Sequence, residues 1–192
     1  MQPLNEQDLW PLPVYEGVRE QFRKEVIAAK QHRRVAVGPF MTFVFENRLT
    51  VKFQVQEILR VERISAPELV REELAGFNTM LPGKGELSAT LLIELSGTDA
   101  AVKAELAKLS GLGRHLWLEL AGTRTAAVME GGRDDGQRVS AVQYVRFPVA
   151  DAKKLAAGPA AIVIDHPAYA HREQLTEGVR RSLAQDLSGH EG

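Results

Sequence analysis

Segments with helical spacing and short apolar segments of strand length alternate along this chain from one end to the other. Apolar residues at three- and four-residue intervals predict helices, whereas short apolar or alternating runs bounded by Gly, Pro or Asn predict strands. We therefore expect an α+β fold, in which helices pack mainly on one face of a mixed, largely antiparallel sheet. The expected helices are residues 16–32, 57–64, 65–78, 98–110, 151–157 and a last one after Tyr169; the expected strands are residues 41–45, 49–56, 87–95, 115–120, 123–130, 140–149 and 160–164.

The length and composition indicate an ordinary globular protein. We expect residues 1–192 to form a single domain, in which lobes 1–82 and 83–192 would share a core. The chain has no cysteine, which excludes disulfides and any iron–sulfur cluster held by its own thiolates. A net charge of -1 predicts neither nucleic acid nor a membrane surface as partner. Because no targeting segment or membrane span is visible, we expect a cytoplasmic protein.

The common nucleotide and nucleophile motifs are incomplete. The glycine pair at Gly83 and Gly85 is followed by Ser88, where a dinucleotide-binding loop requires its third glycine. No serine lies between glycines at the spacing of a nucleophile elbow. Neither motif therefore supports a nucleotide-dependent enzyme or a serine hydrolase.

Polar and charged residues gather around a predicted turn at Asn47 and Arg48. A two-residue turn here would join strand 41–45 to the strictly alternating segment 49–56. We expect a site for an anionic or amide-bearing ligand, or for a hard metal ion held by carboxylates. The alternative is a solvated face, because Glu57 and Arg60 have the spacing of a surface ion pair. The candidate ligand-binding residues are Glu46, Arg48, Gln54, Gln56, Glu57 and Arg60.

A second candidate site follows the apolar strand 160–164. Asp165 and His166 would stand at the end of this strand, where ligands often bind in open sheets. His166 is the candidate catalytic residue, either as a general base or as a metal ligand together with His171. The alternative is a helix entry, in which Asp165 caps the free amides and Pro167 begins the helix.

Several segments resemble an uncharacterised bacterial family, domain-of-unknown-function family 3501. They are RVAVGP at 34–39, FENRLTV at 45–51, FQVQEILRVE at 53–62, LSAT at 87–90, YVRF at 144–147 and DHPAY at 165–169. The resemblance covers nearly the whole chain, although Ile58 stands where relatives often have Met. It implies a stand-alone cytosolic protein encoded beside rubrerythrin and an iron–sulfur protein of the heterodisulfide-reductase type. No catalytic residue follows from it.

Two functions from different classes remain open at this point. The first is a non-enzymatic accessory or ligand-binding protein of a redox or peroxide-defence system, with rubrerythrin or an iron–sulfur redox protein as partner. The second is a small metal-dependent or His-based hydrolase or lyase, in which His166 is the base, Glu46 or Glu57 a metal ligand or acid, and Arg60 the anion clamp. A homo-oligomer built on the exposed strand face is a third, structural option. Convergence of His166 with Glu46 or Glu57 in one cleft would favour the enzyme.

Overall fold

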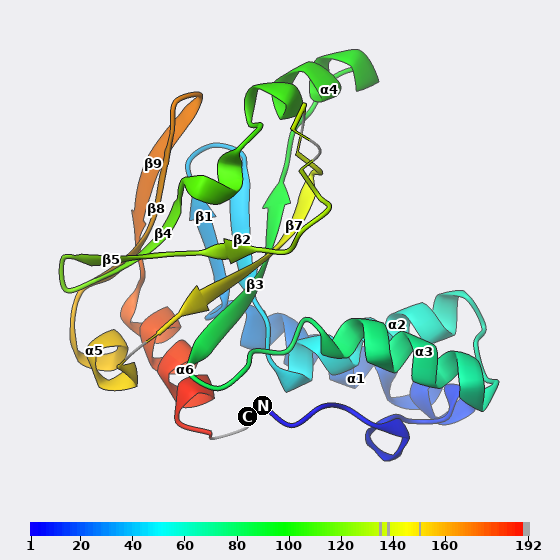
Figure 1. Cartoon of the computed structure of the whole chain (residues 1–192). Helices are drawn as coiled ribbons and strands as arrows, with labels where there is room; N and C mark the ends of the chain where they lie inside the picture. Colours follow the sequence, from blue (N-terminus) through cyan, green and yellow to red (C-terminus); the bar gives the residue numbers. More distant parts are fainter. Residues whose placement is uncertain (135, 138, 150, 190–192) are drawn as a thin grey trace.

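The strands of this chain form two antiparallel sheets (Figure 1). The computed structural model describes residues 1–134, 136–137, 139–149 and 151–189. One sheet has the strand order β1-β2-β3-β7-β6 and the other the order β5-β4-β8-β9. These strands are β1 (Arg34–Val37), β2 (Met41–Phe45), β3 (Glu86–Ile93), β4 (Leu116–Leu120), β5 (Thr123–Ala126), β6 (Val128–Met129), β7 (Val142–Pro148), β8 (Ala160–His166) and β9 (Tyr169–Gln174). The predicted α+β class is confirmed, with its strands divided between two sheets.

The main core lies between the two sheets. Alternate residues of β2 and β3, such as Phe43 and Leu91, point into it from the five-stranded sheet, and Leu118 and Ile162 point into it from the four-stranded sheet. All four side chains are fully buried. This alternation leaves a second, outer face on the five-stranded sheet, because successive side chains of a strand point to opposite sides.

The helices lie in three places: α1 to α3 together, α5 and α6 together, and α4 apart from both at the top of the view (Figure 1). α1 to α3 form a layer beside the five-stranded sheet, with smaller apolar clusters of their own. α5 and α6 pack together and contribute Leu155, Val179 and Leu183 to the main core. No described helix has the length and apolar character needed to span a membrane. The helices are η1 (Glu6–Asp8), α1 (Leu12–Lys30), α2 (Arg48–Val61), α3 (Pro67–Asn78), α4 (Asp99–Lys108), η2 (Leu112–Arg114), α5 (Ala152–Ala157) and α6 (Glu177–Leu187).

The predicted turn at Asn47 and Arg48 and the predicted strand 49–56 are wrong, because this segment is the first part of α2. The Asn47 side chain accepts a hydrogen bond from the Thr50 amide at 3.0 Å, and the Thr50 hydroxyl accepts one from the Asn47 amide at 3.0 Å. This reciprocal cap starts a helix. Val51 and Val55 face one apolar cluster while Phe53 faces another, so burial on two nearly opposite faces of the helix imitates the alternation of a strand.

The predicted helix entry at Asp165 and Pro167 is also wrong. Asp165 belongs to β8, and a short turn leads directly into β9, which pairs His166 with Tyr169. The helix begins only at Glu177. β9 is an edge strand whose residues are exposed after the first, so it lacks the apolar alternation that would predict a strand.

Candidate functional site

The outer face of the five-stranded sheet carries polar side chains in positions that are nearly closed to solvent. Thr42 and Val44 on β2 and Thr90 on β3 lie on the opposite side from the main core, and Glu46 continues this alternation just beyond β2. β2 and β3 pair antiparallel, with Val44 opposite Thr90. This register brings Thr90 close to Glu46, although 44 positions separate them in the sequence.

Glu46 is the most enclosed carboxylate of the predicted site, with 3% of its surface exposed. Its Oε2 accepts hydrogen bonds from the Thr50 hydroxyl at 2.5 Å and from the Gln54 amide at 3.2 Å. Its Oε1 accepts one hydrogen bond, from the Thr90 hydroxyl at 2.6 Å. Because a carboxylate oxygen has two lone pairs, Oε1 keeps one acceptor position that no described residue fills.

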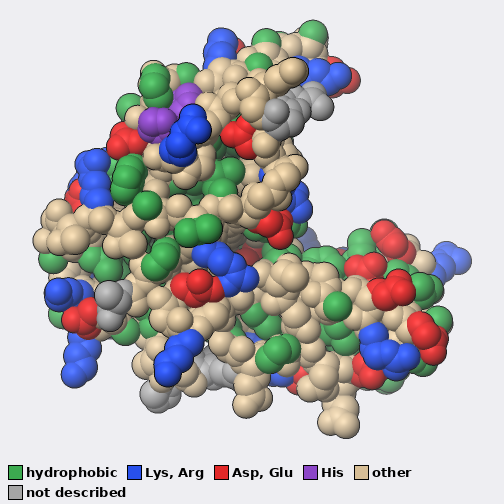
Figure 2. All heavy atoms as spheres, in the orientation of Figure 1, with side chains coloured by type: hydrophobic (Ala, Val, Ile, Leu, Met, Phe, Trp, Pro, Cys, Tyr) green, Lys and Arg blue, Asp and Glu red, His purple; other side chains and the backbone are tan. Residues whose placement is uncertain are grey.

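Glu46 lies in the wall of a hollow of about 440 Å³ between α2, α3 and the outer face of β2 and β3. Figure 2 shows how the molecule is notched between the helical layer and the sheets. The apolar residues that line the hollow are Val44, Phe53, Ile58, Val61, Phe77 and Leu92. The polar or charged residues that line it are Lys30, Glu46, Gln54, Glu57 and Thr90. A volume of this size is typical of pockets for small organic molecules.

Glu57 also lines this hollow, but its charge is already compensated. Arg19 donates to both carboxylate oxygens, from Nε and from Nη2, each at 2.8 Å. The Tyr15 hydroxyl donates to Oε1 at 2.8 Å. The bonds from Arg19 lower the pKa of Glu57, while burial and the bond to Glu57 raise the pKa of Tyr15. Glu46, in contrast, forms no ion pair with any described residue, so the two carboxylates of the hollow differ in chemistry.

Three other predicted site residues fasten the N-terminal segment to α2. Arg48 pairs with Asp8 at 2.7 Å. Gln56 is fully buried, accepts a hydrogen bond from the Trp10 amide at 2.6 Å and donates one to the Trp10 carbonyl at 3.3 Å. Arg60 pairs at 3.1 Å with a glutamate of α1. The structure therefore brings Gln54 and Glu57 together with Glu46, and gives these three other side chains partners elsewhere.

His166 uses both ring nitrogens within the fold. Its Nε2 lies 3.1 Å from the Ser110 carbonyl, and its Nδ1 lies 3.2 Å from the Ala168 amide. A carbonyl only accepts and an amide N–H only donates, so these contacts fix one neutral tautomer, with the proton on Nε2. Asp165 instead faces His115, whose Nδ1 is 3.0 Å from Oδ1. A ring held at both nitrogens has no free position for a proton from a substrate.

The two predicted sites are far apart. His166 pairs with Tyr169, and the Tyr169 ring is 4.4 Å from the ring of Phe40, just before β2. Glu46 lies six residues further along the chain, which corresponds to about 20 Å at the rise of a strand. The convergence that would favour the hydrolase or lyase is therefore not present. Among the described residues, no three His, Asp or Glu side chains are grouped so that they could hold a metal ion.

The contribution of β3 to the site was not predicted from the sequence. Ser88 and Thr90 are polar residues at alternate positions in the otherwise apolar run 87–93. This spacing indicates a second, partly polar face of the sheet, and it was the available signal. Thr50 belongs to the segment 49–56 predicted as a strand, whereas it caps α2 and donates to Glu46.

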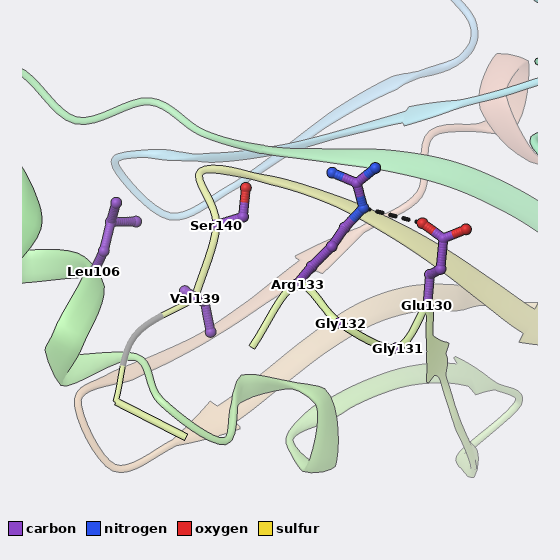
Figure 3. A pocket seen from close by; sticks show the side chains of 7 residues that line it. All are labelled: Leu106, Glu130, Gly131, Gly132, Arg133, Val139 and Ser140. Atoms are coloured by element: carbon purple, nitrogen blue, oxygen red, sulfur yellow. Dashed lines mark hydrogen bonds and ion pairs between the residues drawn. The ribbon is translucent and has the colours of Figure 1, made fainter. Parts of the chain in front are cut away.

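A second hollow of about 630 Å³ lies beside the turn after β6 (Figure 3). Its charged side chains already contact other groups: Arg133 donates to Glu130 at 3.0 Å, and its guanidinium lies 4.2 Å from the centre of the Tyr144 ring. Figure 3 shows this pair at one side of the hollow, with Leu106 at the other. The arrangement stabilises the turn through an ion pair and a cation–π contact.

Comparison with known proteins assigns a family. The model of the family "Protein of unknown function (DUF3501)" matches residues 3–187, and the chain belongs to this family. A crystal structure of a novel protein of unknown function from Burkholderia pseudomallei K96243 has a TM-score of 0.90 and 32% sequence identity. That match covers 97% of this chain and 100% of the other. A search of curated proteins gave no match.

Proposed function

We propose that this DUF3501 chain is a binding protein that holds a small, mainly apolar molecule in the hollow over Glu46. The observation that carries the proposal is a buried carboxylate with an open acceptor position in the wall of an otherwise largely apolar hollow. Small-molecule sites commonly combine apolar walls with a few placed polar groups. A binding role also fits the tautomer of His166, because that ring has no free nitrogen for acid–base chemistry.

The apolar wall offers a direct test. Val61 lies at the end of α2, lines the hollow and is 67% exposed, so Val61→Trp narrows the hollow without disturbing a buried contact. Leu69 on α3 is 47% exposed and does not line the hollow, so Leu69→Trp is the matched control. The probe is the neutral dye N-phenyl-1-naphthylamine, whose fluorescence rises in apolar surroundings.

We expect the dye to bind with a stoichiometry of one per chain. Val61→Trp should weaken the affinity by about tenfold or more, since this factor corresponds to about 1.4 kcal/mol of lost contact. Leu69→Trp should leave the affinity unchanged. Equal affinities in all three proteins, or dye uptake without saturation, would contradict the proposal.

The biological setting of the proposal is a bacterial redox system. Resemblance to the family implies rubrerythrin or an iron–sulfur protein as partner, and a chain without cysteine would serve such a partner by binding rather than by carrying a thiolate-ligated cluster. Co-purification with those proteins tests this part separately. A chain recovered alone from cells that express them would remove the redox setting and leave the binding site intact.

A further inference from the structure

We propose that the ligand of the Glu46 hollow carries a primary amine, and that this end of the ligand lies against Glu46 and donates to Oε1. This inference rests on the proposed function and names the ligand class of the same site. It follows from the hydrogen bonds of Glu46, from its lack of a cationic partner and from the apolar character of the walls.

The hydrogen bonds set the polarity of the ligand. Thr50, Gln54 and Thr90 all donate to Glu46, and all three donors are neutral. The open position on Oε1 is an acceptor, so the complementary group must be a donor. An anionic or purely accepting group would face the carboxylate without a hydrogen bond, which is strongly unfavourable where little water is present.

Charge distinguishes an amine from a hydroxyl. Glu46 forms no ion pair with a described residue. Glu57, the other carboxylate of the hollow, accepts hydrogen bonds from the Arg19 guanidinium at both of its oxygens. Hydrogen bonds in which both groups are charged are shorter and stronger than those between neutral groups. An ammonium group therefore offers Glu46 the counter-charge that the fold supplies to Glu57 and not to Glu46.

The remainder of the ligand should be apolar and of modest size. Beyond Glu46 the walls are formed largely by aliphatic side chains and by the rings of Phe53 and Phe77. The cation in the lining is Lys30, whose Nζ lies 6.0 Å from the centre of the Phe53 ring. Because Lys30 offers an anionic ligand an alternative partner, an anionic probe is an essential comparison.

Three probes with one aromatic body separate these possibilities: benzylamine, benzyl alcohol and benzoate, which differ in the charge of the end group. Each is titrated into the full chain while the backbone amide signals of Glu46, Gln54 and Thr90 are followed by NMR. We expect benzylamine to bind about tenfold or more tightly than benzyl alcohol, as a charge-assisted hydrogen bond predicts. Benzoate should not shift these signals.

Two variants assign the preference to one carboxylate. Glu46→Gln should abolish the advantage of benzylamine over benzyl alcohol, while Glu57→Gln should retain it, because Glu57 is already neutralised by Arg19. Loss of the preference in Glu57→Gln alone would overturn the assignment. The wild-type series is decisive without either variant, since equal binding of amine and alcohol, or tighter binding of benzoate, would refute the amine.

The result also separates this inference from the proposed function. If the neutral dye binds in the hollow but benzylamine has no advantage, the hollow is a binding site and the amine is wrong. If neither the dye nor any benzyl probe shifts signals of the hollow, the proposed function fails as well.

Discussion

Arg33 and Asp186 form a buried ion pair that joins the C-terminal helix α6 to the segment between α1 and β1. The side chains are only 3% and 4% exposed. Arg33 donates to Asp186, and also to the Phe45 carbonyl at 3.0 Å, the Glu46 carbonyl at 3.2 Å and the Ser182 hydroxyl at 2.9 Å. The pair therefore holds the backbone at Phe45 and Glu46, where the candidate site lies.

The two partners should differ in what their removal costs. Asp186→Ala leaves the guanidinium buried without its counter-charge, and loss of one partner of a buried pair costs about 3–5 kcal/mol. Arg33→Met leaves the carboxylate without its counter-charge and two backbone carbonyls without their donor, each worth about 1–3 kcal/mol if it stays dry. We therefore expect Arg33→Met to be the more destabilising substitution.

In the double variant Arg33→Met/Asp186→Leu, the second substitution should raise the free energy of unfolding instead of lowering it further. It removes the isolated carboxylate that Arg33→Met leaves behind, so the double variant should be more stable than Arg33→Met alone. Urea unfolding followed by circular dichroism measures the free energy of unfolding of the wild type, Asp186→Ala, Arg33→Met and the double variant. Arg34→Met is the control, because Arg34 is about half exposed and its ion pair with Glu94 is worth at most about 1 kcal/mol.

The pH dependence provides a second reading of the same pair. Burial already raises the pKa of Asp186 above its ordinary value of 3.8, against the effect of Arg33. In Arg33→Met the positive charge that opposes this shift is gone. Protonation of Asp186 should therefore recover part of the free energy of unfolding that the substitution costs. A raised pKa in the folded state means that stability is full below 3.8 and is lost as pH rises through the folded value. The deficit of Arg33→Met relative to wild type should therefore shrink on acidification. A double variant less stable than Arg33→Met, or a deficit that grows at low pH, would refute this account.

Three further substitutions test other parts of the site. Gln56→Leu removes both hydrogen bonds to the Trp10 backbone and should lower the free energy of unfolding by about 2–4 kcal/mol in urea. Glu57→Gln should flatten the loss of stability at low pH: the Arg19 bonds lower the pKa of Glu57, so its contribution is present above 4.5 and disappears as pH falls through the folded value. Urea unfolding at pH values on both sides of 4.5 measures that slope, and equal slopes would contradict it. Gly38→Ala should lower the melting temperature, since Gly38 has φ 71° and an added Cβ would overlap neighbouring side chains; an unchanged melting temperature would contradict this.

Helix α2 shows both the reach and the limit of sequence patterns. Its residues 49–56 alternate as strictly as any strand, yet they form a helix whose two nearly opposite faces are buried in different clusters. The reciprocal cap of Asn47 and Thr50 was visible only as a pair of polar residues three apart. Periodicity alone cannot separate a strand from a helix buried on two sides, because both place an apolar residue at every second position.

Part of the polar cluster around Glu46 was predicted despite that error. In a strand, Gln54 and Gln56 would share a face; in the helix, Thr50 and Gln54 share a face four residues apart, and Gln56 turns toward Trp10. Glu46 and Gln54 therefore still meet, whereas Gln56 leaves the site. Charge and amide composition indicated a polar centre near residue 46, and the period of the backbone decided which members of the cluster reach it.

Thr90 could not be assigned to the site from sequence, because its position depends on strand register. Val44 pairs with Thr90 and Phe45 with Ala89, so Thr90 lies on the outer face beside Glu46 while Ala89 points into the main core. A shift of the register by one residue would turn every side chain of β3 to the opposite face. Thr90 would then lie in an apolar core and Ala89 beside the carboxylate, which would lose its only donor on Oε1 among the described residues. The same packing that keeps Leu91 and Phe43 buried thus fixes the geometry of the proposed amine site.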